Sequence, residues 1–288
     1  MEWENTPQSS NIEDRRGQGG GFGRGAGGLG IGAILIVLAI SYFTGINPAI
    51  LMGGASIVAG SGQKAPPPSS NAPPANDRMT QLVRHVLGET EAVWSEVLPA
   101  QKGVRYVNPK LVIYSGATQS GCGGAQAAMG PFYCPVDQKV YLDMAFFNDM
   151  QTKFGGGGDF AYAYVIAHEI GHHVQNLLGT LDKVDSIKQQ VSRTQANAYS
   201  VRVELQADCY AGVWANHAND KWNNFINADD VQRALATAKA IGDDRLQTAA
   251  RGYAVPDSFT HGSSAMRQEW LTRGLKSGQM SDCDTFSQ

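Results

Sequence analysis

The sequence predicts an α+β domain over residues 77–288 that follows one transmembrane helix, and three observations lead to this division. After residue 77, several segments space their apolar residues three or four positions apart, and short β-prone runs lie between them. Residues 25–63 contain no Asp, Glu, Lys or Arg. Residues 61–76 are rich in Pro, Ser and Ala, which is typical of a linker.

These observations divide the chain into four parts. We expect a glycine-rich tail at residues 1–24, a membrane anchor at 25–51, a linker at 52–76 and a folded domain at 77–288. The anchor is predicted because its apolar run is long enough to cross a bilayer core, which takes about 20 residues. A cleaved signal peptide is the alternative, but the segment ahead of the run is long and no A-x-A site follows it promptly.

Cations are distributed unevenly around the predicted anchor. Arg15, Arg16 and Arg24 precede it, whereas the first cation after it is Lys64. The positive-inside rule therefore predicts an N-terminus in the cytoplasm and a folded domain outside it. The first 24 residues are polar and then glycine-rich without periodicity, so we expect a flexible cytoplasmic tail there.

The composition limits the classes of partner. The net charge is −3 and only 17% of the residues are charged, so we expect no generally basic surface and no binding to nucleic acid. The apolar content of 42% is enough to form a core and excludes a wholly disordered chain. The oligomeric state leaves no readable pattern.

All four cysteines follow the predicted anchor, which agrees with an oxidising compartment. An even number there predicts two disulfides, although four cysteines allow three pairings. We favour the pairs Cys122–Cys134 and Cys209–Cys283. Zinc binding by these cysteines is the alternative, but no C-x-x-C spacing is present.

The first elements of the folded domain are a helix and three strands. The helix is expected over residues 79–98, with Pro99 ending it. Strands are expected at residues 111–114, 131–134 and 139–143, the last two joined by a turn.

The rest of the domain is predicted to be helical. Asp159 stands at the N-cap of a helix that runs to about residue 178, where Gly179 ends it. Further helices are expected over about 181–192 and 196–217, from a cap at Asn227 or Asp229 through residue 240, and over 263–275.

The helix that follows Asp159 contains the sequence His168-Glu169-Ile170-Gly171-His172. Residues four apart lie on one face of a helix, so both imidazoles can bind one zinc ion. Glu169 follows the first ligand and can act as general base. A solvated helix face is the alternative, and the apolar residues 163–167 argue against it.

A third metal ligand is expected on a later helix. Glu204 and Asp208 are four residues apart and share a face of the helix over residues 196–217. Glu204 can complete the ligand set, while Asp208 can accept the free ring N–H of a ligand histidine. Such an acidic pair is common in helices, and it indicates a metal site only together with the His168–His172 motif. His173 points about 100° away from His172 and is not expected to be a ligand.

The two metal motifs and the surrounding sequence resemble the bacterial neutral zinc metallopeptidase family, which is gluzincin-like. The similarity covers nearly all of residues 77–288 and includes GPFYCPVDQKVYLD, HEIGHHVQ, ELQADCYAGVWA and FTHGSSAMRQEW. It implies a zincin-like fold with a small, mostly antiparallel sheet over the metal-binding helix. It also implies one catalytic Zn²⁺, a peptide or protein substrate, and a single-pass protein of the bacterial inner membrane with its catalytic domain in the periplasm.

The resemblance extends to two further features. The segment from Thr260 to Arg267 is similar to a T-H-x-S-x-x-x-R segment of integral-membrane gluzincins, which implies that His261 stabilises the oxyanion and Arg267 lies close by. Structural roles are the alternatives, with His261 capping the last helix and Arg267 pairing with a carboxylate. The resemblance also implies that the strand at residues 140–143 is a sheet edge that receives an extended peptide.

The function expected from these features is peptide-bond hydrolysis outside the cytoplasm by a zinc-activated water. Two alternatives remain. One is a non-catalytic, zinc-stabilised scaffold or chaperone-like module, which has no need of Glu169. The other is an amidase that acts on cell-wall peptides, which the same motif would serve equally well.

Overall fold

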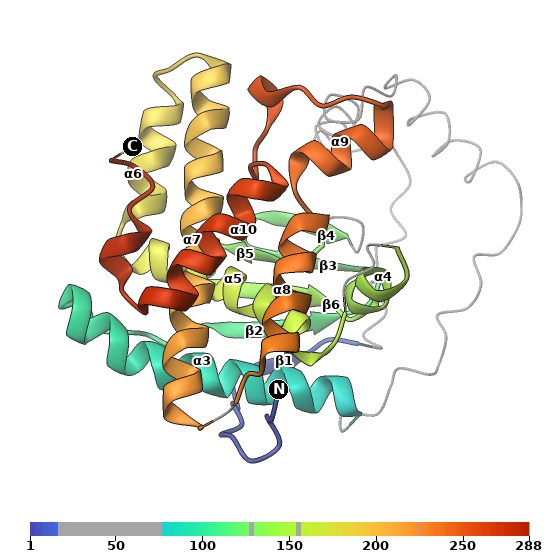
Figure 1. Ribbon diagram of the computed structural model, residues 1–288, viewed down its shortest axis with the longest axis vertical. Coiled ribbons are helices and arrows are strands. Elements are labelled where there is room, and N and C mark those ends of the chain that lie inside the picture. The colour runs from blue at the N-terminus through green and yellow to red at the C-terminus, as the bar shows by residue number, and fades with distance from the viewer. Residues whose placement is uncertain (17–76, 127–129, 154–156, 224, 288) are drawn as a thin grey trace, which may run out of the picture. The chain divides into compact units, whose positions relative to one another are not determined.

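Helices surround a small sheet in this mixed α+β protein (Figure 1). The computed structural model describes residues 1–16, 77–126, 130–153, 157–223 and 225–287. The predicted anchor at residues 25–51 and linker at 52–76 lie outside the described residues. Among the described helices, none is both long enough and apolar enough to cross a membrane.

The main sheet has four strands in the order β1-β2-β6-β5. Strands β1 (Ile12–Asp14), β2 (Lys110–Tyr114) and β6 (Lys139–Asp143) pair in parallel, whereas β5 (Phe132–Cys134) pairs antiparallel with β6. The prediction of a mostly antiparallel sheet is therefore wrong. The hairpin of β5 and β6 was predicted, but the parallel pairing of β6 with β2 was not. A separate antiparallel hairpin is formed by β3 (Ala117–Ser120) and β4 (Gly123–Gln126).

The first 16 residues are part of this folded body. Strand β1 adds to the edge of the sheet, and Ile12 pairs with Leu111. The side chains of Trp3 and Ser9 are only 3% and 4% exposed. The prediction of a flexible tail is therefore wrong for residues 1–16, because one short strand and a few isolated apolar residues produce no periodic signal.

Helix α3 (Arg78–Lys102) begins after Asp77, whose carboxylate accepts the backbone N–H of Thr80 at 3.0 Å. It ends at Gly103, which has a φ of 68°. The prediction that Pro99 ends this helix is wrong. Pro99 lies in the last turn, where its carbonyl still accepts the N–H of Gly103 at 2.9 Å.

Helix α5 (Asp159–Leu177) is buried in the middle of the body and contacts α3, α7, α8 and strands β5 and β6. Its residues from Phe160 to Gly171 are buried on every side, as a helix with an apolar surface all round should be. Gly158 rather than Asp159 is the N-cap. Asp159 instead accepts hydrogen bonds from Trp3 at 2.8 Å and from Arg78 at 2.5 Å.

The other helices complete the body. The predicted ones are confirmed as α6 (Thr180–Lys188), α7 (Arg193–Lys221), α8 (Ala228–Ala240) and α10 (Ser264–Ser277). Helices α4 (Ala145–Lys153) and α9 (Asp243–Arg251) were not predicted, because both are short and weakly apolar. Helices α7 and α10 cross so closely that a Cβ on Gly274 would lie 2.0 Å from the carbonyl oxygen of Cys209.

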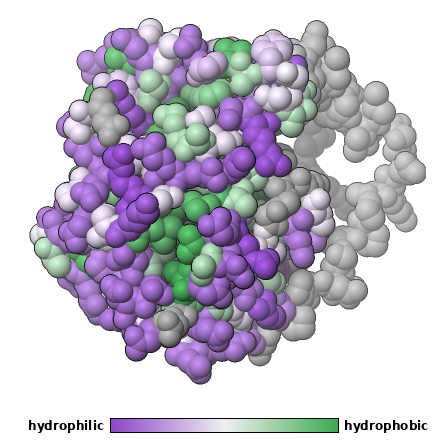
Figure 2. Space-filling view, viewed as in Figure 1, coloured by the Kyte–Doolittle hydropathy of each residue, from purple (hydrophilic) through white to green (hydrophobic). Residues whose placement is uncertain are grey.

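Both expected disulfides are confirmed. Cys122–Cys134 ties the tip of the β3–β4 hairpin to the end of β5, with 5.8 Å between the Cα atoms. Cys209–Cys283 joins α7 to the C-terminal turn at Met280–Cys283. Hydrophilic side chains cover much of the face in Figure 2, while hydrophobic side chains gather near its centre and in smaller groups toward the top.

Candidate metal centre

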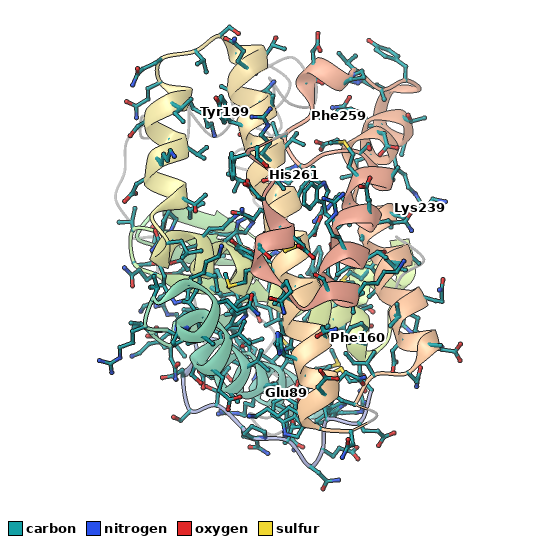
Figure 3. The ribbon with its side chains drawn as sticks, turned by 60° about the vertical axis from the view of Figure 1, so that its left-hand side comes forward. Glu89, Phe160, Tyr199, Lys239, Phe259 and His261 are labelled. Atoms are coloured by element: carbon teal, nitrogen blue, oxygen red, sulfur yellow. A yellow bond between two sulfur atoms is a disulfide. The ribbon has the colours of Figure 1, made fainter. Side chains whose placement is uncertain are left out.

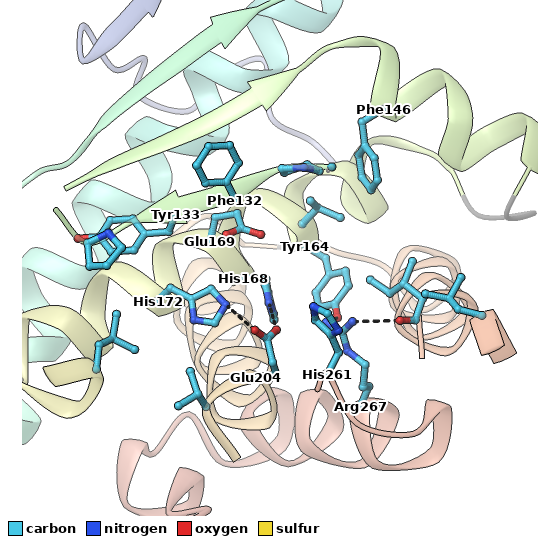
Figure 4. Close-up of a pocket in the computed structure, with 18 residues that line it drawn as sticks. Phe132, Tyr133, Phe146, Tyr164, His168, Glu169, His172, Glu204, His261 and Arg267 are labelled. Carbon is cyan, nitrogen blue, oxygen red and sulfur yellow. Dashed lines mark hydrogen bonds and ion pairs between the residues drawn. The ribbon is translucent and has the colours of Figure 1, made fainter. Parts of the chain in front are cut away.

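The buried helix α5 and the neighbouring helix α7 bring the predicted metal ligands together. His168 and His172 project from α5 toward Glu204 on α7 (Figure 4). One donor atom from each of the three residues lies within 4.8 Å of the others. Nε2 of His168 is 3.1 Å from one carboxylate oxygen of Glu204, and Nε2 of His172 is 3.6 Å from the other.

These distances fit a zinc ion. Ligand atoms about 2.0–2.2 Å from a tetrahedral zinc lie about 3.3–3.6 Å from one another. The separations of 3.1 and 3.6 Å lie close to this range, and because all three donor atoms lie within 4.8 Å of one another, side-chain movements of about 1 Å bring the set to zinc-binding distances. Two imidazoles and one carboxylate also form a donor set typical of catalytic zinc, which leaves a fourth position open.

His168 is held from behind by a buried polar cluster. Its Nδ1 donates to Asp208 at 2.8 Å, because a carboxylate can only accept, and this leaves Nε2 for a metal. Asp208 also accepts the hydroxyl of Tyr164 at 2.6 Å and two guanidinium nitrogens of Arg267 at 2.8 and 2.9 Å. The remaining guanidinium nitrogen of Arg267 donates to the carbonyl of Ile241 at 3.4 Å.

His172 is oriented in the same way by Gln175, which sequence reasoning missed. Nδ1 of His172 lies 2.8 Å from the amide oxygen of Gln175. The amide nitrogen of Gln175 donates to the carbonyl of Val203 at 2.8 Å and to Gln206 at 3.1 Å, so the oxygen must face the imidazole. A neutral side chain three residues after a histidine carries no distinctive sequence signal.

Opposite charges surround the metal-binding nitrogens. Burial alone would lower the pKa of His168, but the carboxylates of Asp208 and Glu204 outweigh it and raise the pKa to about 10. Burial alone would raise the pKa of Glu204, but positive charge on His172 and His261 holds that pKa well below its usual range. An ionised carboxylate beside two imidazoles is a site where a divalent cation can take the place of bound protons.

A cleft of about 590 Å³ opens over this cluster (Figure 4). Glu169, which is 7% exposed, lines it beside His168 and has no hydrogen-bond partner among the described residues. His261 lines it beside Glu204 and keeps about half of its side chain exposed, at 52%. The walls are largely apolar and include Phe132, Phe146, Val165, Leu181, Val203 and Leu246.

The remaining predicted residues lie in different surroundings. Arg267 is 3% exposed and is engaged with Asp208 as described, which is the structural alternative considered for it. His173 points away from the cleft, bonding to Tyr133 at 3.0 Å and to the carbonyl of Val107 at 2.6 Å. Burial lowers the pKa of His173 to about 4, so it is neutral.

The sheet edge beside the cleft is not the predicted strand. Residues 139–143 form β6, which lies inside the sheet between β2 and β5, so the prediction of a receiving edge there is wrong. Strand β5 forms this edge of the described sheet instead. Phe132 and Tyr133 of β5 line the cleft.

Comparison with known proteins agrees with this arrangement. Residues 1–286 match the family described as "Putative neutral zinc metallopeptidase". The chain belongs to this family. The match includes the two helices that supply His168, His172 and Glu204, and the family description therefore agrees with the donor set.

Two similar proteins each cover more than half of the chain. The uncharacterized protein YpfJ of Escherichia coli K12 is 42% identical over 293 residues, covering 99% of each protein. The uncharacterized protein Rv2575 of Mycobacterium tuberculosis is 46% identical over 206 residues, covering 68% of this chain and 67% of the relative. No solved structure matches significantly.

Proposed function

We propose that the protein is a zinc-dependent peptidase that hydrolyses peptide bonds. The observation that carries this proposal is the His168, His172 and Glu204 donor set, with the carboxylate of Glu169 beside it in one cleft and free of hydrogen bonds to the described residues. A purely structural zinc site needs neither an open cleft nor a free carboxylate next to its ligands. A zinc ion bound there would act as a Lewis acid, which lowers the pKa of water to about 7 and polarises a carbonyl group.

The side chains around the donor set divide the chemical work. Glu169 accepts a proton from the water that attacks the peptide carbonyl and passes it to the leaving amine. His261 donates a hydrogen bond to the carbonyl oxygen as negative charge develops there. Arg267 acts indirectly, because its guanidinium holds Asp208 and thereby His168.

The cleft suits an extended polypeptide. Strand β5 forms its rim and can pair with a substrate backbone by strand addition. The apolar walls suit hydrophobic side chains close to the scissile bond. We also propose that this body works outside the cytoplasm, because all four cysteines are joined in two disulfides.

Zinc content of the purified full-length chain is the first test. Wild type should hold one zinc, and both His168→Ala and Glu204→Ala should lose it. Glu169→Gln should retain zinc and lose at least about a hundredfold in peptide hydrolysis, because the amide cannot accept a proton. A wild type without zinc would overturn the proposal, and so would a Glu169→Gln variant that hydrolyses peptides at the wild-type rate.

Substrate panels separate the remaining alternatives. Casein and peptide libraries should be cleaved, whereas purified peptidoglycan fragments should not. Cleavage of the cell-wall fragments alone would identify an amidase in place of a peptidase. A zinc-loaded protein that cleaves neither substrate class would indicate the scaffold alternative.

A further inference from the structure

Asp243 lies behind His261 and holds the whole segment around it. The residue begins helix α9 and is 7% exposed. One carboxylate oxygen, Oδ2, accepts the backbone N–H groups of Thr260 and His261, each at 2.6 Å, and of Gly262 at 3.1 Å. In return, the backbone N–H of Asp243 donates to the carbonyl of Gly262 at 2.9 Å.

The second carboxylate oxygen faces the imidazole. Oδ1 of Asp243 lies 3.3 Å from Nδ1 of His261. Because a carboxylate can only accept, Nδ1 must carry the hydrogen in this contact. The hydroxyl oxygen of Thr260, 3.1 Å from the same nitrogen, is a second acceptor for that hydrogen. Both partners engage one side of the ring, which leaves Nε2 on the cleft side.

We propose that Asp243 is a positioning residue for the reaction. It fixes both the backbone that carries His261 and the rotation of the ring, so that Nε2 faces the carbonyl oxygen of the substrate. This inference rests on the proposed function, since it assigns His261 the role of stabilising the oxyanion. Asp243 itself touches no substrate, because it lies behind the imidazole.

A role limited to anchoring the loop is the competing explanation, and the next residue provides a matched control. Oδ1 of Asp244 accepts the backbone N–H and the hydroxyl of Ser264, each at 2.7 Å. Asp244 therefore anchors the same segment, three residues beyond His261, through contacts that do not involve the imidazole. If anchoring were all that mattered, loss of either aspartate would have similar consequences.

The kinetic test uses the full-length, zinc-loaded chain and four variants. These are Asp243→Ala, Asp244→Ala, His261→Phe and the double variant Asp243→Ala/His261→Phe. Asp243→Ala should lower kcat about tenfold to a hundredfold with little change in KM, and Asp244→Ala should lower kcat less than about threefold. When His261 is already replaced by Phe, adding Asp243→Ala should not lower kcat further. Equal losses for the two aspartates, or additive losses in the double variant, would overturn the proposal.

A second readout does not depend on peptidase activity. The ring-nitrogen NMR signals of His261 report the hydrogen on Nδ1, and they should change in Asp243→Ala but not in Asp244→Ala. Asp243→Asn keeps an oxygen for the backbone N–H groups and serves if the alanine variant does not fold. Unchanged His261 signals in Asp243→Asn would refute the positioning role. Changed signals in a protein without peptidase activity would instead refute the proposed function and leave the contact intact.

Discussion

Asp208 is a carboxylate with no exposure to solvent, and the cations beside it keep it ionised. Arg267 contacts both of its oxygens, at 2.8 and 2.9 Å. Burial would raise the pKa of Asp208, but the charges of Arg267 and His168 lower it to about 2. The ionised form is therefore built into the fold directly behind the metal-binding nitrogen of His168.

Arg267→Met should destabilise the protein by about 3 kcal/mol or more, because it leaves a buried charge without its partner. Zinc affinity should also fall about tenfold to a hundredfold, since His168 loses its fixed orientation. Denaturant unfolding and zinc competition measure the two effects. Lys221→Ala is the control, because its pair with Glu96 is exposed and contributes less than about 1 kcal/mol. Equal losses in both variants would show that the buried pair has no special role.

A second buried carboxyl group, on Glu89, lies far from the cleft and near the N-terminal segment (Figure 3). Oγ1 of Thr6 is 2.5 Å from Glu89, 2.7 Å from the carbonyl of Trp3 and 3.1 Å from Nδ1 of His85. The hydroxyl of Thr6 donates to Glu89, which by itself lowers the pKa of this carboxyl group. Burial outweighs this hydrogen bond and raises the pKa of Glu89 to about 8, so the folded protein holds Glu89 as a neutral acid at pH 7.

The protonation of Glu89 makes stability depend on pH. Between the ordinary pKa of 4.5 and about 8, the folded protein holds a proton that the unfolded chain releases. Stability should therefore fall as pH rises through this range. Glu89→Gln removes the group that takes up this proton. Between pH 5 and pH 8, the free energy of unfolding of the variant should therefore rise relative to that of wild type by a few kcal/mol, at about 1.4 kcal/mol for each unit of pKa difference. Parallel unfolding curves for the two proteins across pH would contradict this assignment.

At the scale of elements, local sequence patterns predicted the helices and strands that depend on residues close together in the chain. The spacing of His168 and His172 follows from helix geometry, and Ser192, Asn227 and Ser263 cap their helices through contacts three residues away. The strands at 111–114, 131–134 and 139–143 were also found. The order of the strands in the sheet was not predicted, because β2 pairs with β6 through residues 29 positions apart and the N-terminal strand β1 adds to the other edge of β2.

The parts of the site that sequence reasoning missed are those set by distant contacts. Gln175 and Asp243 act through hydrogen bonds to histidines, and nothing beside them in the chain marks that role. Asp243 begins a short helix whose existence was itself not predicted. Arg267 was noticed only through resemblance, and its contact with Asp208 is visible only once α7 and α10 are packed together.

Helix α3 shows how a tertiary contact overrides local propensity. Gly88 lies in the middle of this helix, where alanine would ordinarily be more favourable by up to about 1 kcal/mol. A Cβ at this position would lie 2.4 Å from the carbonyl oxygen of Pro7 and 2.9 Å from the amide nitrogen of Ser9. The close approach of residues 7–9 therefore requires glycine.

Gly88→Ala should destabilise the protein despite the better helix propensity of alanine. The N-terminal segment must move away from α3, so its contacts from Trp3 to Ser9 weaken. Thermal unfolding and limited proteolysis of residues 1–16 measure the effect. Ser95→Ala, on an exposed face of the same helix, should change the unfolding temperature little. A Gly88→Ala protein that is more stable than wild type would show that residues 1–16 do not pack on α3.

At the scale of the whole molecule, two distant parts of the chain form one body. Residues 1–16 and the residues from 77 onward belong to the same compact unit and share the sheet through β1 and β2. A chain that crosses a bilayer once between residues 16 and 77 would place these two parts on opposite sides of a core about 30 Å thick. It could not then pair Ile12 with Leu111. A cytoplasmic tail at residues 1–16 and an outer domain at residues 77–288 are thus incompatible with this sheet.

The two parts should therefore be accessible from the same side of the membrane. Ser10 and Val136 are both exposed, so Ser10→Cys and Val136→Cys each offer a thiol for a maleimide that cannot cross membranes. In intact spheroplasts we expect both variants to be labelled, because the disulfides favour an oxidising compartment. If neither cysteine is labelled until the cells are opened, the result would agree with the sheet but refute the location outside the cytoplasm. Labelling of Val136→Cys alone would mean that β1 does not join the sheet in the cell, since a strand cannot pair across a bilayer.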